Sequence, residues 1–347
     1  MVVLEELSHQ QGEAATQTEL VAEKIRSELS QPYMLGNYEC HTTPSIGVSL
    51  FRGHLDSMED LLKHADVAMY QAKMAGRNAI RFFDPQTQAA LEKRAAMEVD
   101  LRRALARQQF LLHYQVQVDS RGKATGAEVL LRWKHPERGF VFPDQFIPLA
   151  EETGLIVPIG LWVLETACAQ LNAWQHDALT RDLTLAVNVS AKQFHQADFV
   201  AQVQRVLLES GAKPSLLKLE LTESAVLENV QETITKMHEI KLLGVSFSMD
   251  DFGTGYSSLQ YLKRLPLDQI KIDRSFVIDI TSNPDDAAIV QAIIVMTEAL
   301  GLNVIAEGVE TEAQRDFLDK HGCHAFQGYL YSRPVIVGEF EVLLDGL

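Results

Sequence analysis

Cysteine is scarce in this chain of 347 residues, and the three that occur form no CxxC pair. They are Cys40, Cys168 and Cys323. This usage excludes a disulfide framework and a zinc cluster, and it is typical of a reducing cytosol. No apolar run approaches the roughly 18 residues that span a membrane, and the first residues lack a signal-peptide pattern. We therefore expect a soluble, cytoplasmic chain without direct membrane insertion.

An excess of basic residues is also lacking, because 31 Lys and Arg stand against 47 Asp and Glu, a formal net charge of −16. The acidic residues are spread along the chain rather than gathered in a tail. Such a surface repels a phosphate backbone, so DNA and RNA are not expected partners. A small phosphorylated ligand is compatible with this charge where metal ions neutralise it locally.

The first part of the chain, residues 1–84, predicts a small α/β unit. The length and the 46% hydrophobic content indicate about two domains with sizeable cores. Ser57 can cap a helix whose apolar spacing continues to Gly76, the residue expected at its end. The other elements expected here are strands at 1–6, 45–51 and 78–83 and a polar helix at about 12–29.

The next segment, residues 86–107, predicts one amphipathic helix with many charges. The apolar positions near helical spacing are Leu91, Met97, Leu101 and Leu105. We interpret residues 85–107 as a helical linker, a solvated connector with one packed stripe, and residues 108–347 as the second domain.

The second domain contains eight short β-rich runs, and most of the stretches between them are long enough for helices. The runs lie at 110–118, 127–133, 183–190, 217–224, 245–251, 269–273, 303–310 and 324–330. Eight strands alternating with helices in about 250 residues predict a (β/α)8 TIM-like barrel of the α/β class. The main rival, a doubly wound open sheet, normally carries a glycine-rich phosphate turn after its first strand, and none is found.

Nearly every run ends in a polar residue that can bind metal or phosphate. These residues are Glu128, Asn188, Glu220 with Glu223, Asp250 with Asp251, Lys271, Glu307 with Glu310, and Gln327. One alone could be a capped turn or a surface charge, but their recurrence in step with the strands is hard to explain by solvation. The C-terminal strand ends of a barrel converge on one face, where active sites lie. Oxygen ligands without His or Cys indicate Mg²⁺ or Mn²⁺, which would hold such a cluster of carboxylates together.

The run VSFSMDDFGTG at 245–255 places two adjacent acids, Asp250 and Asp251, before a flexible glycine loop. Successive side chains of a strand point to opposite faces, so adjacent acids share a site only where the strand gives way to a loop. There one acid can bridge two cations while its neighbour holds the second. An ordinary Asp-rich turn is the alternative for this segment alone. The DFG triplet also occurs in kinases, but their glycine-rich nucleotide loop and HRD segment are missing.

The segments SIGVSLF and LLKHADVAMYQAKMAGRNAIRFFD resemble the C-terminal half of a GGDEF diguanylate cyclase domain. The resemblance covers residues 1–84, but the glycine-rich signature that carries the family's catalysis is not in this chain. We therefore expect a partial GGDEF-like segment without cyclase activity, with a complete GGDEF region and an upstream sensor in the full-length protein.

Residues 96–347 resemble the EAL family of cyclic di-GMP phosphodiesterases. The matching segments, in the family's order, are EVLLRW, FIPLAEETG, NVS, ELTES, DDFGTGYSSL, IKID, AEGVE and QGYLYSRP. One departure is that the naming triplet reads EVL, with Val129 in place of alanine. The carboxylate of Glu128 is kept and Val129 points away from it, so we expect a small packing change and no loss of activity.

The resemblance implies two Mg²⁺ or Mn²⁺ ions per active site. The first would be held by Glu128, Asn188, Glu220 and Asp250. Asp250 would bridge to the second ion, which Asp251 and Glu307 would also hold. Lys271 would position or polarise the attacking water, and the catalytic residues would be Glu128, Lys271 and Glu307.

The resemblance also implies residues for substrate binding and support. Arg132 would contact a substrate phosphate, and Gln327 would hold a metal-bound water. Glu223 would anchor the loop at 253–257, and Glu310 would support the site without entering it.

The implied reaction cuts one phosphodiester bond of cyclic di-GMP and gives linear pGpG, a step in bacterial second-messenger signalling. The alternative from another class is a non-catalytic cyclic di-GMP receptor, because some family members bind the ligand after losing metal ligands. The ligand set is complete here, which favours the enzyme, whereas a pure scaffold has no support in the sequence. We also expect a homodimer, in the cytoplasm or in the cytoplasmic part of a membrane-anchored sensor.

Overall fold

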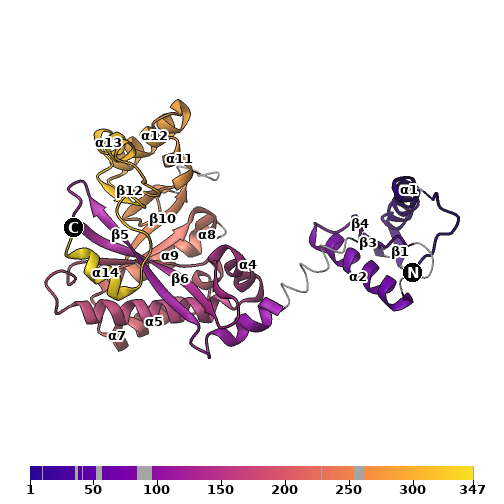
Figure 1. The fold of residues 1–347 in the computed structure, drawn as a ribbon, viewed down its shortest axis with the longest axis horizontal. Coiled ribbons are helices and arrows are strands. Elements are labelled where there is room, and N and C mark those ends of the chain that lie inside the picture. Colours follow the sequence, from indigo (N-terminus) through magenta and orange to yellow (C-terminus); the bar gives the residue numbers. More distant parts are fainter. Residues whose placement is uncertain are drawn as a thin grey trace. The chain divides into compact units, whose positions relative to one another are not determined.

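The computed structural model of the chain describes residues 1–9, 11–35, 38–40, 42–51, 57–83, 96–227, 229–253 and 262–346. The chain forms two compact units, Met1–Met97 and Glu98–Leu347 (Figure 1). The predicted domain boundaries at 84 and 107 stay a prediction, because residues 84–95 lie outside the described part. Of the predicted linker helix, residues 96–104 are described and are helical.

The first unit contains a two-stranded parallel sheet packed on a helix. β3 (Ile46–Val48) pairs with β4 (Ile80–Phe82), and α2 (Met58–Met74) connects them. Ser57 caps α2 by accepting a hydrogen bond from a backbone N–H of the first turn, as predicted. Gly47 of β3 lies so close to α2 that an added Cβ would overlap the helix backbone, which explains why this position has no side chain.

The other elements of the first unit agree with the sequence only in part. α1 (Gln11–Leu29) confirms the predicted polar helix, and β1 (Tyr33–Leu35) with β2 (Tyr38–Cys40) forms a hairpin that was not predicted. The predicted strand at 1–6 is wrong, because these residues have no regular secondary structure and are largely exposed. An apolar run forms a strand only where a neighbour accepts its backbone hydrogen bonds, and no described strand pairs with this one.

The second unit is a closed barrel of eight strands, which confirms the predicted fold class. The strands are β5 (Phe110–Asp119), β6 (Ala124–His135), β8 (Thr184–Asn188), β9 (Leu217–Thr222), β10 (Ser246–Phe252), β11 (Gln269–Ile272), β12 (Asn303–Ala306) and β13 (Ala325–Gln327). They pair in this order, and β13 pairs with β5 to close the barrel. β7 (Gly139–Val141) lies outside this ring as an antiparallel neighbour of the far end of β6. All eight predicted β-rich runs coincide with barrel strands.

The first barrel strand departs from the all-parallel arrangement expected of this fold. β5 is antiparallel to both of its neighbours, β6 and β13. A tight turn joins β5 to β6, in which the Asp119 carboxylate accepts two backbone N–H groups and Gly122 has a φ of +78°. Such a short connection has no room for a crossover helix, so the chain must reverse as a hairpin.

Helices surround these strands in the second unit (Figure 1). They are α4 (Pro143–Thr153), α5 (Ile156–Trp174), α6 (Ala191–Phe194), α7 (Phe199–Ser210), α8 (Glu223–Leu227), α9 (Val230–Leu242), α11 (Arg274–Ile278), α12 (Pro284–Leu300), α13 (Glu312–Lys320) and α14 (Val337–Leu344). Glycines in the left-handed region end three of them, at Gly154, Gly211 and Gly301.

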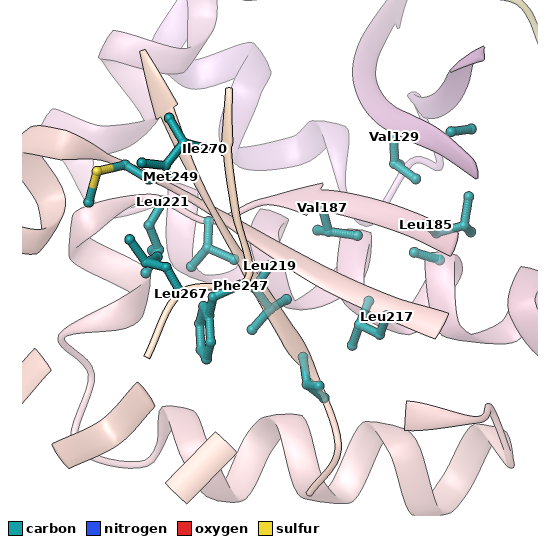
Figure 2. Packing of buried hydrophobic residues seen from close by; sticks show 14 of the residues in the cluster. Val129, Leu185, Val187, Leu217, Leu219, Leu221, Phe247, Met249, Leu267 and Ile270 are labelled. Atoms are coloured by element: carbon teal, nitrogen blue, oxygen red, sulfur yellow. The ribbon is translucent and has the colours of Figure 1, made fainter. Parts of the chain in front are cut away.

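The hydrophobic core fills the space between the strands and the helices. Alternate residues of each strand contribute to it, and Figure 2 shows those of neighbouring strands packed together. They include Leu185, Val187, Leu217, Leu219, Leu221, Phe247, Met249 and Ile270, all of which are buried. The other alternate residues therefore face the inside of the barrel.

Among the described residues, one helix has the length and composition to cross a membrane. This helix is α5, and its buried residues recur at intervals of three and four along the side that packs on the barrel. That pattern is the one expected of a core helix in a globular domain.

Candidate active site

The inward-facing side chains of the barrel are polar at most positions. In β9, Lys218 and Glu220 alternate with the apolar core residues, and in β11 Gln269 and Lys271 do the same. Barrel interiors are usually filled by branched aliphatic side chains. Burying polar groups costs free energy unless they are paired, so the contacts inside this barrel must account for them.

Lys271 lies at the centre of the polar interior, where it is only 1% exposed. Its Nζ atom is 2.6 Å from Glu220 Oε2 and 3.2 Å from Asp250 Oδ1. The same atom is 2.5 Å from Glu307 Oε1 and 3.5 Å from Glu128 Oε2. The four carboxylates come from β6, β9, β10 and the residue after β12, so only the closed barrel brings them together. We call Lys271 and these four acids the carboxylate cluster.

Glu128 is held from both sides by amide groups. Asn188 Nδ2 donates to Glu128 Oε1 at 2.6 Å, and Gln327 Nε2 donates to Glu128 Oε2 at 2.5 Å. Gln327 Oε1 in turn accepts from Gln117 Nε2 at 2.9 Å, and Gln327 Nε2 is 3.2 Å from Gln115 Oε1. The predicted role of Gln327 in holding a metal-bound water stays a prediction, since here it bonds Glu128 directly.

The sequence analysis missed Gln115 and Gln117 because the first predicted run, residues 110–118, contains no acid. A signal was present, since polar residues occupy alternate positions of the run HYQVQV. Their alternation marks one polar face of β5, and that face is the inside of the barrel.

Asp250 and Asp251 lie in a β-bulge, which corrects the expectation that the strand ends at this pair. β10 continues to Phe252, and its register against β11 shifts between Met249 and Phe252. The two acids thus stand opposite the single residue Lys271, and Asp251 takes the left-handed φ of +55°. A bulge re-aims side chains within a strand, so adjacent acids can approach one site without a loop between them.

The charges of the cluster are strongly coupled. Burial, with repulsion from Glu128 and Asp250, raises the pKa of Glu220 to about 8 despite the attraction of Lys271. Burial likewise raises the pKa of Glu307 well above its ordinary value. Burial lowers the pKa of Lys271, but the four carboxylates outweigh it and hold this pKa well above its ordinary value. The lysine is therefore charged, and the cluster has more negative charge than one ammonium neutralises.

The donor chemistry of the cluster fits a hard divalent cation. Glu220 Oε1 is buried and, within the described part of the chain, accepts no hydrogen bond. The available donors are carboxylate and amide oxygens, the ligands of Mg²⁺ and Mn²⁺. The described residues contain no ready-made group of three His, Cys, Asp or Glu side chains for a metal, so cations would replace contacts that Lys271 makes here.

Arg132 lies on the same face of β6 as Glu128, four residues further along the strand. The side chain is half-buried, and burial lowers its pKa from the ordinary value. Its Nη1 donates to the carbonyl oxygen of Leu131 at 2.9 Å. Arg132 therefore lies on the inner face of β6, one step of the side-chain alternation beyond Leu130 and toward the C-terminal end of the strand from Glu128.

Glu310 and Glu223 are not members of the carboxylate cluster. Glu310 is exposed and its Oε1 accepts from Arg274 Nη2 at 2.9 Å. Glu223 begins α8 and is buried, and neither of its carboxylate oxygens has a hydrogen-bond partner among the described residues. The loop that it was predicted to anchor continues into residues 254–261, which lie outside the described part, so that role stays a prediction.

Comparison with known protein families gives two matches. The EAL domain family matches residues 98–334, and the diguanylate cyclase GGDEF domain family matches residues 1–79. The first match contains every residue of the carboxylate cluster.

Curated relatives are similar along most of the chain. The bifunctional diguanylate cyclase/cyclic di-GMP phosphodiesterase MucR of Pseudomonas aeruginosa is 46% identical over 316 residues, which are 91% of this chain and 46% of MucR. The cyclic di-GMP phosphodiesterase PdeR of Escherichia coli is 38% identical over 323 residues, 93% of this chain and 49% of PdeR. The chain thus spans less than half the length of these relatives.

A solved structure is similar to the second unit. The PaMucR phosphodiesterase in complex with c-di-GMP is 48% identical, covers 70% of this chain and 98% of its own, and superposes with a TM-score of 0.68.

Proposed function

The chain belongs to the EAL domain family, and on that basis we propose that it is a metal-dependent phosphodiesterase that hydrolyses cyclic di-GMP to linear pGpG. The observation that carries this proposal is the carboxylate cluster, in which four acids meet Lys271 inside the barrel. Relatives named cyclic di-GMP phosphodiesterases support the substrate.

We propose that the cluster holds two divalent cations, Mg²⁺ or Mn²⁺. Two such ions would neutralise the phosphodiester and lower the pKa of a water that attacks it. The residues proposed for the first ion are Glu128, Asn188, Glu220 and Asp250. Those proposed for the second are Asp250, Asp251 and Glu307. Their fit follows from the oxygen donors and from the excess of negative charge in the cluster.

The protein's own side chains would orient the reactants. Lys271 carries an ammonium whose hydrogens point at the carboxylates, so it can hold a water among them by hydrogen bonds. Arg132, on the same face of β6 as Glu128, would hold a substrate phosphate above the cluster. In the reaction the water oxygen forms a bond to phosphorus, one ring P–O bond breaks, and the leaving oxygen takes a proton.

We also propose the cellular location, the domain context and the oligomeric state of the enzyme. The acidic composition and the few cysteines support a cytoplasmic protein that does not bind DNA or RNA. The GGDEF match and the greater length of the relatives support a larger protein with a complete GGDEF region and an upstream sensor. We propose that residues 85–107 link the GGDEF-like segment 1–84 to the phosphodiesterase domain 108–347, and that the protein acts as a homodimer.

Hydrolysis of cyclic di-GMP by the purified chain tests this function. Product is expected with Mg²⁺ or Mn²⁺, none in excess chelator, and none from Glu128→Gln. Glu298→Gln changes an exposed acid of α12 and serves as the matched control with wild-type turnover. Tight binding of cyclic di-GMP without product under every cation would make the chain a receptor and refute the enzyme.

A further inference from the structure

The helix at residues 96–104 is tied to the turn that follows β6 by one acid, Asp100. Its Oδ2 atom is 3.3 Å from His135 Nε2 and 3.0 Å from Arg138 Nη2. His135 is only 6% exposed, whereas Asp100 and Arg138 are partly exposed. The helix that precedes the barrel therefore holds the end of the strand that carries Glu128 and Arg132.

The contacts of His135 define its chemical form. Its Nδ1 accepts the backbone N–H groups of Glu137 at 3.2 Å and Arg138 at 3.1 Å. A ring nitrogen that accepts carries no hydrogen, so the imidazole is neutral with its hydrogen on Nε2. That hydrogen points to Asp100, and all hydrogen-bonding groups of the ring are then used. The side chain thus fixes both the tight turn and the distance to the helix.

The adjacent outward-facing residue of β6 is fixed as well. Trp133 is fully buried beside Phe110 and Phe146, with ring centroids 6.2 Å and 5.6 Å away. Its Nε1 donates to Gln109 Oε1 at 3.1 Å. Arg132 directly precedes Trp133 and its side chain points to the opposite face, and His135 lies two residues further along the strand, so the anchoring of Trp133 and His135 sets the path of the backbone at this end of β6.

Arg132 depends on that backbone path. Its guanidinium donates a hydrogen bond to the carbonyl oxygen of Leu131 in its own strand. No described carboxylate forms an ion pair with it within 4.0 Å. A shift of β6 at this point would therefore move the Arg132 guanidinium with it. The carboxylate cluster would move less, because its acids come from several strands and share contacts with Lys271.

We propose that Asp100 is a positioning residue for Arg132, and that it transmits displacement of the preceding helix to the substrate site. The inference rests on the proposed function, in which Arg132 binds a substrate phosphate. Release of Asp100 lets the end of β6 move, which weakens phosphate binding and leaves the cation site unchanged. A signal arriving through the helix would then act on substrate affinity.

Two substitutions of Asp100 and one control test this. Asp100→Asn keeps an acceptor for His135 but loses the charge that pairs with Arg138, and Asp100→Ala loses both. We expect KM to rise about threefold and about tenfold respectively, with kcat and the Mg²⁺ concentration for half-maximal rate near wild type. The control is Glu98→Gln, which breaks the exposed Glu98–Arg102 pair of 2.6 Å on the same helix and should change none of these values.

A double-mutant cycle separates positioning from general stability. In an Arg132→Ala background, Asp100→Ala should raise KM no further, because the residue it positions is gone. If Asp100→Ala folds poorly, Arg138→Gln tests the same proposal, because it removes the charged partner of Asp100 at a more exposed position. It should raise KM about threefold. A lowered Tm with wild-type KM, or equal effects of Asp100→Ala with and without Arg132, would overturn the proposal. Failure of the proposed function looks different, because wild type itself would then give no product.

Discussion

Replacing Lys271 by methionine removes the one positive charge from the carboxylate cluster and nearly preserves the side-chain volume. Breaking a buried ion pair by removal of one partner costs about 3–5 kcal/mol. Lys271 contacts four acids and is 1% exposed, so in chelator we expect a loss of unfolding free energy in this range. For a unit of this size, the loss corresponds to a Tm lower by roughly 6–20 °C.

Divalent cations should separate the structural and the catalytic roles of Lys271. Cations that bind among the same acids bind only the folded state and therefore stabilise it. They should restore most of the decrease in Tm that Lys271→Met causes. Turnover of cyclic di-GMP should stay lower by about 10²–10⁴-fold, because the group that orients the water is missing. Thermal unfolding followed by circular dichroism, in chelator and in excess Mg²⁺, together with product analysis, measures both.

A lysine of helix α9 in the same unit serves as the control. Lys241 pairs with one partly exposed acid, Asp268, at 2.5 Å. Lys241→Met should cost at most about 1 kcal/mol, and equally with and without Mg²⁺. If Lys271→Met were as stable as wild type in chelator, or retained the wild-type rate in Mg²⁺, the account of the cluster would be refuted.

Three further predictions concern single residues. Gly328→Ala should lower Tm and turnover, because an added Cβ would overlap the backbone of the loop after β12. At Gly338 an added Cβ meets nothing within 4 Å, so Gly338→Ala should stabilise α14 by about 0.5–1 kcal/mol in denaturant titrations. The raised pKa of Glu220, about 8 in the folded chain, predicts that metal-free protein loses Tm as pH rises from 5.5 to 8.5; the loss should shrink in Glu220→Gln, and an unchanged loss would contradict the assignment. Asp250→Asn should abolish binding of both cations and Asp251→Asn of one; equal metal counts by elemental analysis would refute that division.

The barrel could be predicted from the sequence because its strands carry two independent signals. Each run has apolar residues at alternate positions, and most have an acid or amide where the strand meets the site. The antiparallel start was not predicted, although the turn around Gly122 leaves too few residues for a helix. The contacts of Gln115 and Gln117 with Gln327 place them on the inner face of β5.

The details of the site depend on contacts that a linear pattern does not contain. The bulge at Asp250 and Asp251 arises from one extra residue relative to β11, and sequence spacing alone does not reveal a register shift. The charge of Lys271 depends on which acids surround it, and these come from four separate stretches of the chain. The strand expected at 1–6 failed for a similar reason, because a strand requires a partner and not only an apolar run.

The central claim is that the acids around Lys271 hold catalytic cations, and anomalous diffraction from crystals grown with Mn²⁺ tests it most directly. The account predicts manganese peaks within bonding distance of Glu128, Glu220 and Asp250, with Lys271 Nζ displaced from its present contacts. The same preparation must hydrolyse cyclic di-GMP. Full turnover in a preparation whose cluster keeps the lysine–carboxylate contacts, with no manganese among the acids, would contradict it.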